Sequence, residues 1–289
     1  MNLTRSESES AAWDEVAPCY EEAIISPFAP GVRFRFRKDV HRIIRKWQID
    51  GTLEHRVVTD FGCGCGLALS LIARRVGFAV GIDFSEKMLD QSQSRLEKAG
   101  INVSRYSRRN GLRALAHRID RFERAALPEH QTVLVNSDMR RLGPLHKRID
   151  LGLAINSICP PNSRDVKVIF REVTACIKSG GLCIFLFPSM DTMYYLLGLI
   201  RRYGAKRAKA SELGHLERED GFYVGKNGDR QKYFMPNEIQ NLFESQGWVI
   251  DEMEKLRYPW DLVGRMGWGY FPKHQRLWDW YVIGHSLNR

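Results

Sequence analysis

Three glycines at alternate positions, with an aspartate two residues before the first, form the part of this sequence best suited to hold a small charged molecule. The aspartate is Asp60, and the glycines are Gly62, Gly64 and Gly66. Glycine allows tight backbone turns and leaves no Cβ to obstruct a ligand lying on the loop. A second carboxylate, Asp83, ends the next apolar segment, a position from which an acid reaches both hydroxyls of a ribose. The pattern predicts a nucleotide-like ligand.

The neighbouring residues predict a strand, a helix and a second strand around this loop. Residues 57–59 suit a short buried strand, and residues 67–76 carry apolar side chains at helical spacing before Gly77. A helix that begins directly after the glycines points its free backbone amides at the bound molecule. Residues 78–82 complete the unit as a second strand that ends at Asp83.

The position of Asp60 separates two classes of ligand. A dinucleotide places an anionic pyrophosphate on such a loop, and its usual spacing is Gly-x-Gly-x-x-Gly rather than the Gly-x-Gly-x-Gly found here. S-adenosylmethionine carries a sulfonium and an amino group, and both suit a neighbouring carboxylate. The loop therefore favours S-adenosylmethionine over a nicotinamide or flavin cofactor.

Residues 60–66 and 83–89 together resemble motif I and the following acidic motif of class I S-adenosylmethionine-dependent methyltransferases. After a predicted strand at 132–136, residues 138–142 resemble the adenine-binding motif of that family. The resemblance implies that Asp138 accepts a hydrogen bond from the adenine amino group and that Met139 covers the ring. It implies these cofactor-binding residues: Asp60, Gly62, Gly64, Gly66, Asp83, Phe84, Asp138, Met139, Ala154 and Tyr20.

The same resemblance implies the fold class, a doubly wound, mainly parallel α/β sheet of seven strands whose last strand is antiparallel. Further strands are expected at 149–155, 182–187, 248–256 and 277–285, with helices over 190–203 and beginning near Ser163 and Pro236. The 289 residues are enough for a single domain spanning 1–289. N-terminal helices and insertions are expected to form a lid over the substrate.

Three segments do not belong to the predicted sheet. Residues 1–12 are polar and predict a flexible tail, and residues 189–233 predict a cap over the substrate. Residues 101–131 predict a basic insertion, helical over 112–122, that binds an acidic substrate or nucleic acid; few aromatic residues accompany its arginines, which disfavours stacking on RNA bases. The arginines of this insertion are Arg105, Arg108, Arg109, Arg113, Arg118, Arg121 and Arg124.

Trp13 and Tyr20 open an amphipathic N-terminal segment. A similar arrangement precedes motif I in several small-molecule methyltransferases, where the tyrosine closes over the cofactor. The alternative is that Trp13 and Tyr20 only pack this segment against the domain.

The end of the strand at 149–155 should lie beside the transferred methyl group, because ligands bind outside the carboxyl ends of strands near a topological switch point. Asn156 stands there, but the order of residues differs from the Asn-Pro-Pro-aromatic signature of adenine and glutamine methylation. Cys159 is not preceded by proline, as a covalent cysteine of cytosine-5 methylation would be. The catalytic residues stay unassigned; Asn156, Tyr20 and His215 are candidates by position alone.

Composition bounds the partners of the protein. The net charge is +10, which suits phosphate-bearing partners without identifying one, and the six cysteines lack the spacing of a metal site. No apolar run reaches the length of a membrane span, so we expect a cytoplasmic enzyme. From the spacing of the cysteines we expect no bound metal. The expected acceptor is a small molecule that offers an O, N or C atom. RNA or a protein is the alternative acceptor, and a non-catalytic cofactor-binding scaffold is a different class of function.

Overall fold

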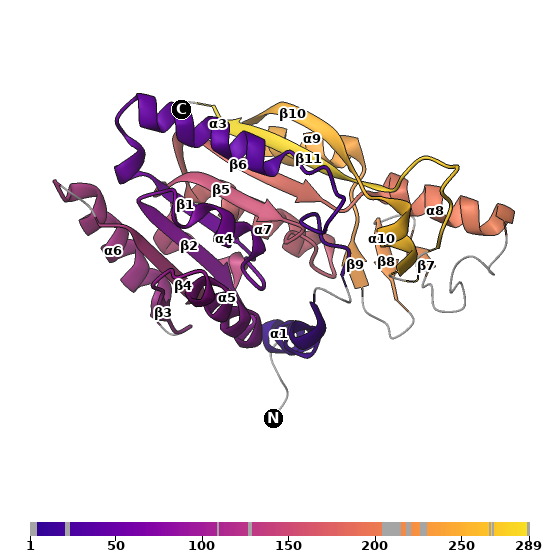
Figure 1. Cartoon of the computed structure of the whole chain (residues 1–289), viewed down its shortest axis with the longest axis horizontal. Helices are drawn as coiled ribbons and strands as arrows, with labels where there is room; N and C mark the ends of the chain where they lie inside the picture. Colours follow the sequence, from indigo (N-terminus) through magenta and orange to yellow (C-terminus); the bar gives the residue numbers. More distant parts are fainter. Residues whose placement is uncertain are drawn as a thin grey trace.

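The computed structural model describes residues 5–20, 24–108, 110–126, 129–203, 215–217, 221–225, 230–265, 267 and 269–287. Its centre is a twisted sheet with helices on both faces (Figure 1). The strand order across the sheet is β10-β11-β6-β5-β1-β2-β4-β3. These strands are β1 (Val57–Phe61), β2 (Phe78–Asp83), β3 (Ser104–Tyr106), β4 (Gln131–Asn136), β5 (Ile149–Ile155), β6 (Ile177–Phe187), β10 (Trp248–Arg257) and β11 (Trp278–Ser286).

The sheet reverses its winding between β1 and β5. From β1 the chain builds outward through β2 and β4, and it then crosses back to place β5 and β6 on the other side of β1. These strands pair in parallel, whereas β11 is antiparallel to both β6 and β10. The predicted doubly wound class with an antiparallel last strand is confirmed. The switch point at the carboxyl ends of β1 and β5 is where this fold binds ligands.

Alternating apolar residues on the strands form two cores. Val58 and Leu134 face the helices α3, α4 and α5, whereas Val57, Phe61 and Phe78 face the helices α6, α7 and α9. Each strand residue thus buries its side chain against one helical layer or the other, as expected for a sheet covered on both sides. The helices are α1 (Arg5–Val16), α3 (Phe36–Ile49), α4 (Leu67–Ile72), α5 (Glu86–Lys98), α6 (Gly111–Arg124), α7 (Ser163–Cys176), α8 (Met190–Tyr203), α9 (Pro236–Ser245) and α10 (Trp260–Arg265), with short 3-10 turns η1 (Ala17–Cys19), η2 (Leu53–His55), η3 (Met139–Arg141) and η4 (Gly143–Leu145).

The segment 101–131 is part of the sheet and its helical layer, not an insertion that covers the substrate. Its residues form β3, an eighth strand that extends the expected seven by pairing in parallel with β4, and then α6. The apolar face of α6 is buried, and Phe122 packs edge-on against Phe78 of β2 at 5.0 Å between ring centroids. The predicted helix at 112–122 is confirmed. The lid expected from this segment is wrong, because α6 needs the sheet to bury its apolar face.

Two arginines of this segment, Arg105 and Arg118, make contacts inside the molecule, whereas Arg108, Arg113, Arg121 and Arg124 are exposed. Arg105 pairs with Glu86 and Asp90 of α5, and Arg118 donates to Gln131 and to the Tyr106 hydroxyl. Arg109 lies outside the described residues. Pairing of this kind leaves less positive charge for a partner than the sequence indicates.

The N-terminal prediction of a flexible tail over 1–12 is wrong for residues 5–12, which begin the helix α1. Ser10 of this helix donates to the Phe84 carbonyl at 2.9 Å, and Glu9 pairs with Arg140. These contacts dock α1 on the main domain, which explains why a polar stretch is ordered. Residues 1–4 lie outside the described part of the chain.

A second, smaller sheet lies beyond the carboxyl ends of the parallel strands (Figure 1). Its order is β7-β8-β9, from β7 (His215–Glu217), β8 (Phe222–Val224) and β9 (Arg230–Lys232). Together with α8 it makes up the described parts of the segment 189–233, whose residues 204–214, 218–220 and 226–229 are outside the description. Within the described residues, no helix is both long and apolar enough to cross a membrane.

Candidate cofactor and acceptor site

The glycine loop leaves β1 at the switch point with three left-handed glycines. Gly62, Gly64 and Gly66 have φ values of 70°, 50° and 77°, a region that glycine adopts without strain. A Cβ on Gly62 would lie 2.4 Å from the Ser157 Cβ, and one on Gly66 would lie 2.4 Å from the Ser92 Oγ. A Cβ on Gly64 would meet nothing within 4 Å. Two of the glycines are therefore needed for packing, and Gly64 leaves an open stretch of backbone.

Asp83 holds the loop from the end of β2. Its Oδ2 accepts from the Gly64 amide at 2.8 Å, and its Oδ1 accepts from the Ser85 amide at 2.9 Å. Burial raises the pKa of Asp83 to about 6, although these amide bonds favour its charged form. A carboxylate has about four lone-pair positions, so Asp83 keeps acceptor capacity for hydroxyl groups.

Asp60 is buried in β1 beneath the same loop, and its Oδ2 has no hydrogen-bond partner among the described residues. Burial, and then the nearby charge of Asp83, raises the pKa of Asp60 to about 7. An unpartnered buried carboxylate oxygen is costly in free energy. A cationic group placed on the loop would remove that cost, which is the property expected of a site for an amino or sulfonium group.

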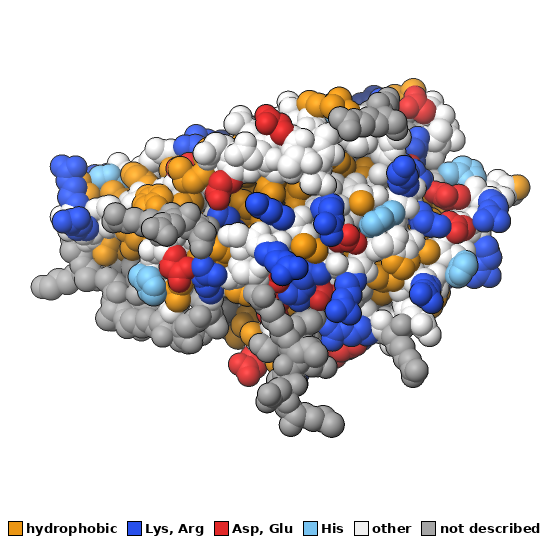
Figure 2. All heavy atoms as spheres, turned by 180° about the vertical axis from the view of Figure 1, so that it is seen from behind, with side chains coloured by type: hydrophobic (Ala, Val, Ile, Leu, Met, Phe, Trp, Pro, Cys, Tyr) orange, Lys and Arg blue, Asp and Glu red, His pale blue; other side chains and the backbone are white. Residues whose placement is uncertain are grey.

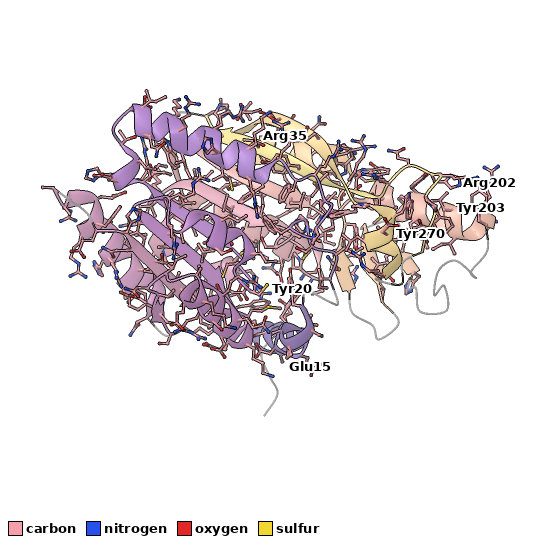
Figure 3. All side chains as sticks on the ribbon, viewed as in Figure 1. Glu15, Tyr20, Arg35, Arg202, Tyr203 and Tyr270 are labelled. Carbon is pink, nitrogen blue, oxygen red and sulfur yellow. The ribbon has the colours of Figure 1, made fainter. Side chains whose placement is uncertain are left out.

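Tyr20 reaches the same region from the N-terminus. Burial is the largest cause that raises the pKa of Tyr20, and the nearby charges of Asp83 and Asp60 raise it further. Figure 3 places Tyr20 between α1 and the ends of the strands, with Glu15 pointing away from them. That Tyr20 closes over the cofactor stays a prediction.

The predicted adenine-binding residues lie at the end of β4. The Asp138 carboxylate accepts from the Arg140 amide at 2.9 Å and from its guanidinium at 2.8 Å. Arg140 also pairs with Asp165 and Glu9, so it links η3, α7 and α1. Arg140 was not among the predicted site residues, and its role as the partner of Asp138 comes from the tertiary structure.

The three remaining predicted cofactor-binding residues lie around the loop, and they are Phe84, Met139 and Ala154. Phe84 offers its carbonyl to Ser10 and to Asn136, and the Met139 Cε lies 3.4 Å from the position of a Cβ on Gly62. Ala154 is buried within β5. Met139 thus borders the glycine loop, as an adenine-covering side chain should.

Asn156 ends β5 in a strained backbone conformation, with φ at 52°. Its Nδ2 donates to the Asp279 Oδ2 at 3.2 Å, and its buried Oδ1 has no partner among the described residues. Left-handed residues other than glycine cluster at functional sites, where surrounding contacts impose the strain. His215, the third catalytic candidate, lies exposed in β7 on the small sheet, paired with Val224, and the structure does not bring it to Asn156.

Sequence reasoning missed Asp279 and Tyr258. The Tyr258 hydroxyl donates to the Asp279 Oδ2 at 2.6 Å, and the Ser189 amide donates to the Oδ1 at 3.2 Å. One signal was present: Asp279 is a carboxylate between two tryptophans in a predicted buried strand. Because β11 is antiparallel, its first residues, not its last, lie at the edge where β5 and β6 end.

No group of three or more His, Cys, Asp or Glu side chains suited to a metal ion occurs in the described part of the chain.

Known proteins resemble this chain in sequence and in fold. A family model described as a methyltransferase domain matches residues 58–122, which run from β1 into α6. A relative from Dictyostelium discoideum, named a probable 18S rRNA (guanine-N(7))-methyltransferase, is 23% identical over 229 residues, which are 72% of this chain and 77% of that protein. A methyltransferase structure from Methanosarcina mazei has a TM-score of 0.54 at 14% identity and covers 84% of this chain and 98% of its own. Magnesium protoporphyrin IX methyltransferase from Synechocystis PCC 6803, solved with bound S-adenosylmethionine, has a TM-score of 0.53 at 12% identity over 99% of this chain and 100% of its own.

The family match covers the glycine loop and the second strand, and the fold neighbours share the arrangement around them. Residues 58–122 match a methyltransferase domain, and the fold of the chain is that of class I S-adenosylmethionine-dependent methyltransferases. The relatives differ in the molecules that their names say they act on, so the family does not identify the acceptor.

Proposed function

We propose that this methyltransferase transfers a methyl group from S-adenosylmethionine to an oxygen or nitrogen atom of a small molecule. The observation that carries the proposal is a group of buried polar atoms at the switch point that have no hydrogen-bond partner among the described residues. The buried oxygens without a hydrogen bond among the described residues include the Asn156 Oδ1 and the Ser157 Oγ. Such atoms are costly unless a ligand completes their hydrogen bonds.

The residues at the glycine loop fit the cofactor. Asp60 would neutralise its amino group, Asp83 would accept from the ribose hydroxyls, and the open backbone at Gly64 would let the molecule approach. Met139 would cover the adenine, with Asp138 and its partner Arg140 beside it, and Tyr20 would close the site from α1. The support is the unpartnered Asp60 Oδ2 and the free space at Gly64.

The bound cofactor supplies an activated methyl group on a sulfonium. The protein then has to orient the acceptor in line and keep water away, and both effects lower the barrier by ordering the reactants before the reaction. Buried tyrosines suit both requirements, and Tyr233 and Tyr258 are 8% and 4% exposed beside the switch point. The small sheet β7-β8-β9 beyond the strand ends is proposed as the cap of the acceptor site.

Calorimetric titration with S-adenosylmethionine, S-adenosylhomocysteine and NADH tests the cofactor assignment. Transfer of tritium from methyl-labelled S-adenosylmethionine into a low-molecular-mass metabolite fraction, with total RNA as a separate acceptor, tests the acceptor class. We expect binding of the first two compounds and label in the metabolite fraction. Label confined to the RNA would contradict the small-molecule proposal.

RNA is a second candidate acceptor because of a specific surface feature. An open groove of about 450 Å³ is lined by Arg164, Lys167 and Arg171 of α7 with Gln246, and the three cationic residues are exposed. Figure 2 shows the face that carries α7, where Lys and Arg side chains are spread widely with acidic ones among them. The relative named as an rRNA methyltransferase adds to this possibility.

The groove offers a sharper test of RNA binding than the arginines of residues 101–131, because Arg105 is already paired with acids. RNA binding should be measured at low and at near-physiological salt, since neutralised phosphates make affinity fall steeply with ionic strength. The variant combines Arg164→Ala, Lys167→Ala and Arg171→Ala, with Arg105→Ala as the matched control. Binding that survives salt and is lost only in the triple variant would favour RNA.

A further inference from the structure

Asp279 lies in a hydrogen-bonded group at the edge where the parallel strands end. Its Oδ2 accepts from the Tyr258 hydroxyl at 2.6 Å and from the Asn156 Nδ2 at 3.2 Å. Its Oδ1 accepts from the Ser189 amide at 3.2 Å. The three donors come from the chain after β10, the end of β5 and the chain after β6. Residues far apart in sequence thus fix one carboxylate in place.

Titratable groups surround Asp279. Burial, and then the nearby charge of Asp279, raises the pKa of Cys159 and of Tyr233. The titratable groups facing Asp279 are therefore Tyr258, Cys159 and Tyr233, which are all neutral at physiological pH. Burial raises the pKa of Asp279 to about 6, while the bonds from Tyr258 and Asn156 favour its charged form. None of the groups hydrogen-bonded to Asp279 in the described residues is a cation.

The group has unused capacity to bind a polar ligand. A carboxylate offers about four lone-pair positions, and the three donors leave one of them for another donor. The neighbouring Asn156 Oδ1 and Ser157 Oγ are buried without partners in the described part of the chain. These two neighbouring oxygens can both accept hydrogen bonds, so they suit a ligand that donates them. Asn156 follows β5 at the switch point, where the Ser157 Cβ approaches Gly62.

We propose that Asp279 is the general base of this methyltransferase and that Tyr258 and Asn156 are positioning residues that hold its carboxylate toward the acceptor. This inference rests on the proposed function and makes it more specific, because it requires an acceptor that carries a proton to be removed. Hydroxyl and neutral N–H groups meet this requirement.

The proposed step conserves atoms and electrons. A lone pair of the acceptor oxygen or nitrogen forms the bond to the methyl carbon, and the carbon–sulfur bond breaks with its electron pair remaining on sulfur. The acceptor proton passes to the Asp279 carboxylate, which becomes a carboxylic acid and later releases the proton to solvent. A base whose pKa lies close to the working pH is effective in such a transfer.

The first experiment needs no acceptor. Protein labelled with ¹³C at aspartate carboxyl carbons is titrated by NMR, and the signal absent from Asp279→Asn is assigned to Asp279. We expect a midpoint near 6, and a higher midpoint in Tyr258→Phe because the hydroxyl bond that favours the carboxylate is lost. A midpoint near the ordinary value of aspartate, or one that Tyr258→Phe leaves unchanged, would overturn the proposal.

The second experiment measures methyl transfer from labelled S-adenosylmethionine into the acceptor fraction that the wild type modifies, between pH 5 and 9. Asp279→Asn should lower the rate by about 100-fold or more and remove the rising limb near pH 6. Tyr258→Phe should keep that limb but move it to higher pH. The matched control is Tyr281→Phe, which removes a buried tyrosine–aspartate bond, to Asp39, on the same strand, and should leave the limb in place.

Cofactor binding separates the possible failures. Asp279→Asn should bind S-adenosylmethionine within about threefold of the wild type by calorimetry, since Asp279 is assigned to the acceptor and not to the cofactor. If the wild type itself does not bind the cofactor, the proposed function fails, and the carboxyl titration still decides the state of Asp279. An Asp279→Asn variant with the wild-type pH profile would overturn the assignment of the base. A loss of rate that is equal at every pH would also overturn it, and would instead identify Asp279 as a binding group for a cationic acceptor.

Discussion

Asp60 and Asp150 are buried aspartates of the same sheet with opposite environments. The Asp150 carboxylate is bonded to Arg56 at 2.7 Å, to Lys178 at 2.8 Å and to the Val57 amide at 2.9 Å. The Asp60 Oδ2 has no such partner among the described residues. A buried charge with its partners supports the fold, whereas one without a partner is retained at a cost. This contrast indicates that Asp60 is kept for a ligand.

At the residue scale we predict opposite effects of two isosteric substitutions. Asp60→Asn should weaken S-adenosylmethionine binding by about 1–3 kcal/mol, the cost of losing a charged partner, yet raise the stability of the apoprotein at pH 8. Asp150→Asn should leave affinity nearly unchanged and lower stability by about 3–5 kcal/mol, because it breaks a buried ion pair. Calorimetry and denaturant unfolding measure the two quantities. If Asp60→Asn and Asp150→Asn changed the stability of the apoprotein equally, the assignment of Asp60 to ligand binding would be contradicted.

At the scale of elements, helices of similar polarity have different roles. The helix α6 buries Leu115, Ile119 and Phe122 in the core and completes the sheet layer. The helix α1 instead lies on the edge of the site, and it is held by polar contacts from Ser10 to Phe84 and from Asp14 to Ser85. Elements held by few polar contacts open more easily than elements of the core. The docking of α1 should therefore be easier to disrupt than the packing of α6.

We predict that Asp14→Ala loosens α1 and weakens cofactor binding. The Asp14 Oδ1 accepts from the Ser85 hydroxyl at 2.5 Å and from the Lys87 amide at 3.2 Å, and both bonds are lost in the variant. Affinity for S-adenosylmethionine should fall by about 5- to 150-fold, since two bonds with a net value of about 0.5–1.5 kcal/mol each are removed. Hydrogen exchange of α1 should rise in parallel. Glu15→Ala, at an exposed neighbour that points away from the domain, is the control (Figure 3).

At the scale of the whole molecule, three carboxylates at one edge of the sheet have raised pKa values. The pKa of Asp60 is raised to about 7, and those of Asp83 and Asp279 are raised to about 6, from 3.8, with burial as the main cause. Between pH 4 and 7 the folded protein therefore binds more protons than the unfolded chain. Stability must then fall as the pH rises through that range, because the folded state has to accept the buried charges.

We predict that the melting temperature of the apoprotein decreases from pH 5 to pH 8 and that S-adenosylmethionine raises it more at pH 8 than at pH 5. The cofactor brings positive charge to the carboxylates, and each unit of pKa shift corresponds to about 1.4 kcal/mol. Thermal unfolding at four pH values, with and without the cofactor, measures both effects. Asp60→Asn should flatten the slope. A melting temperature that rises steadily toward pH 8 would show that folding does not raise the pKa values of these carboxylates.

The sequence by itself determined the cofactor loop, because local spacing carries that information: glycines with left-handed φ, a flanking acid and a second acid at a strand end are all within 24 residues, 60–83. It also indicated the fold class, because its motifs resemble those of class I methyltransferases and apolar runs alternate with helix starts along the chain. Only the tertiary structure decided that residues 101–131 extend the sheet and that α1 docks on the site. It alone brought Asp279 to Asn156, which are 123 positions apart, because the antiparallel course of β11 places its first residues at the edge where β5 ends.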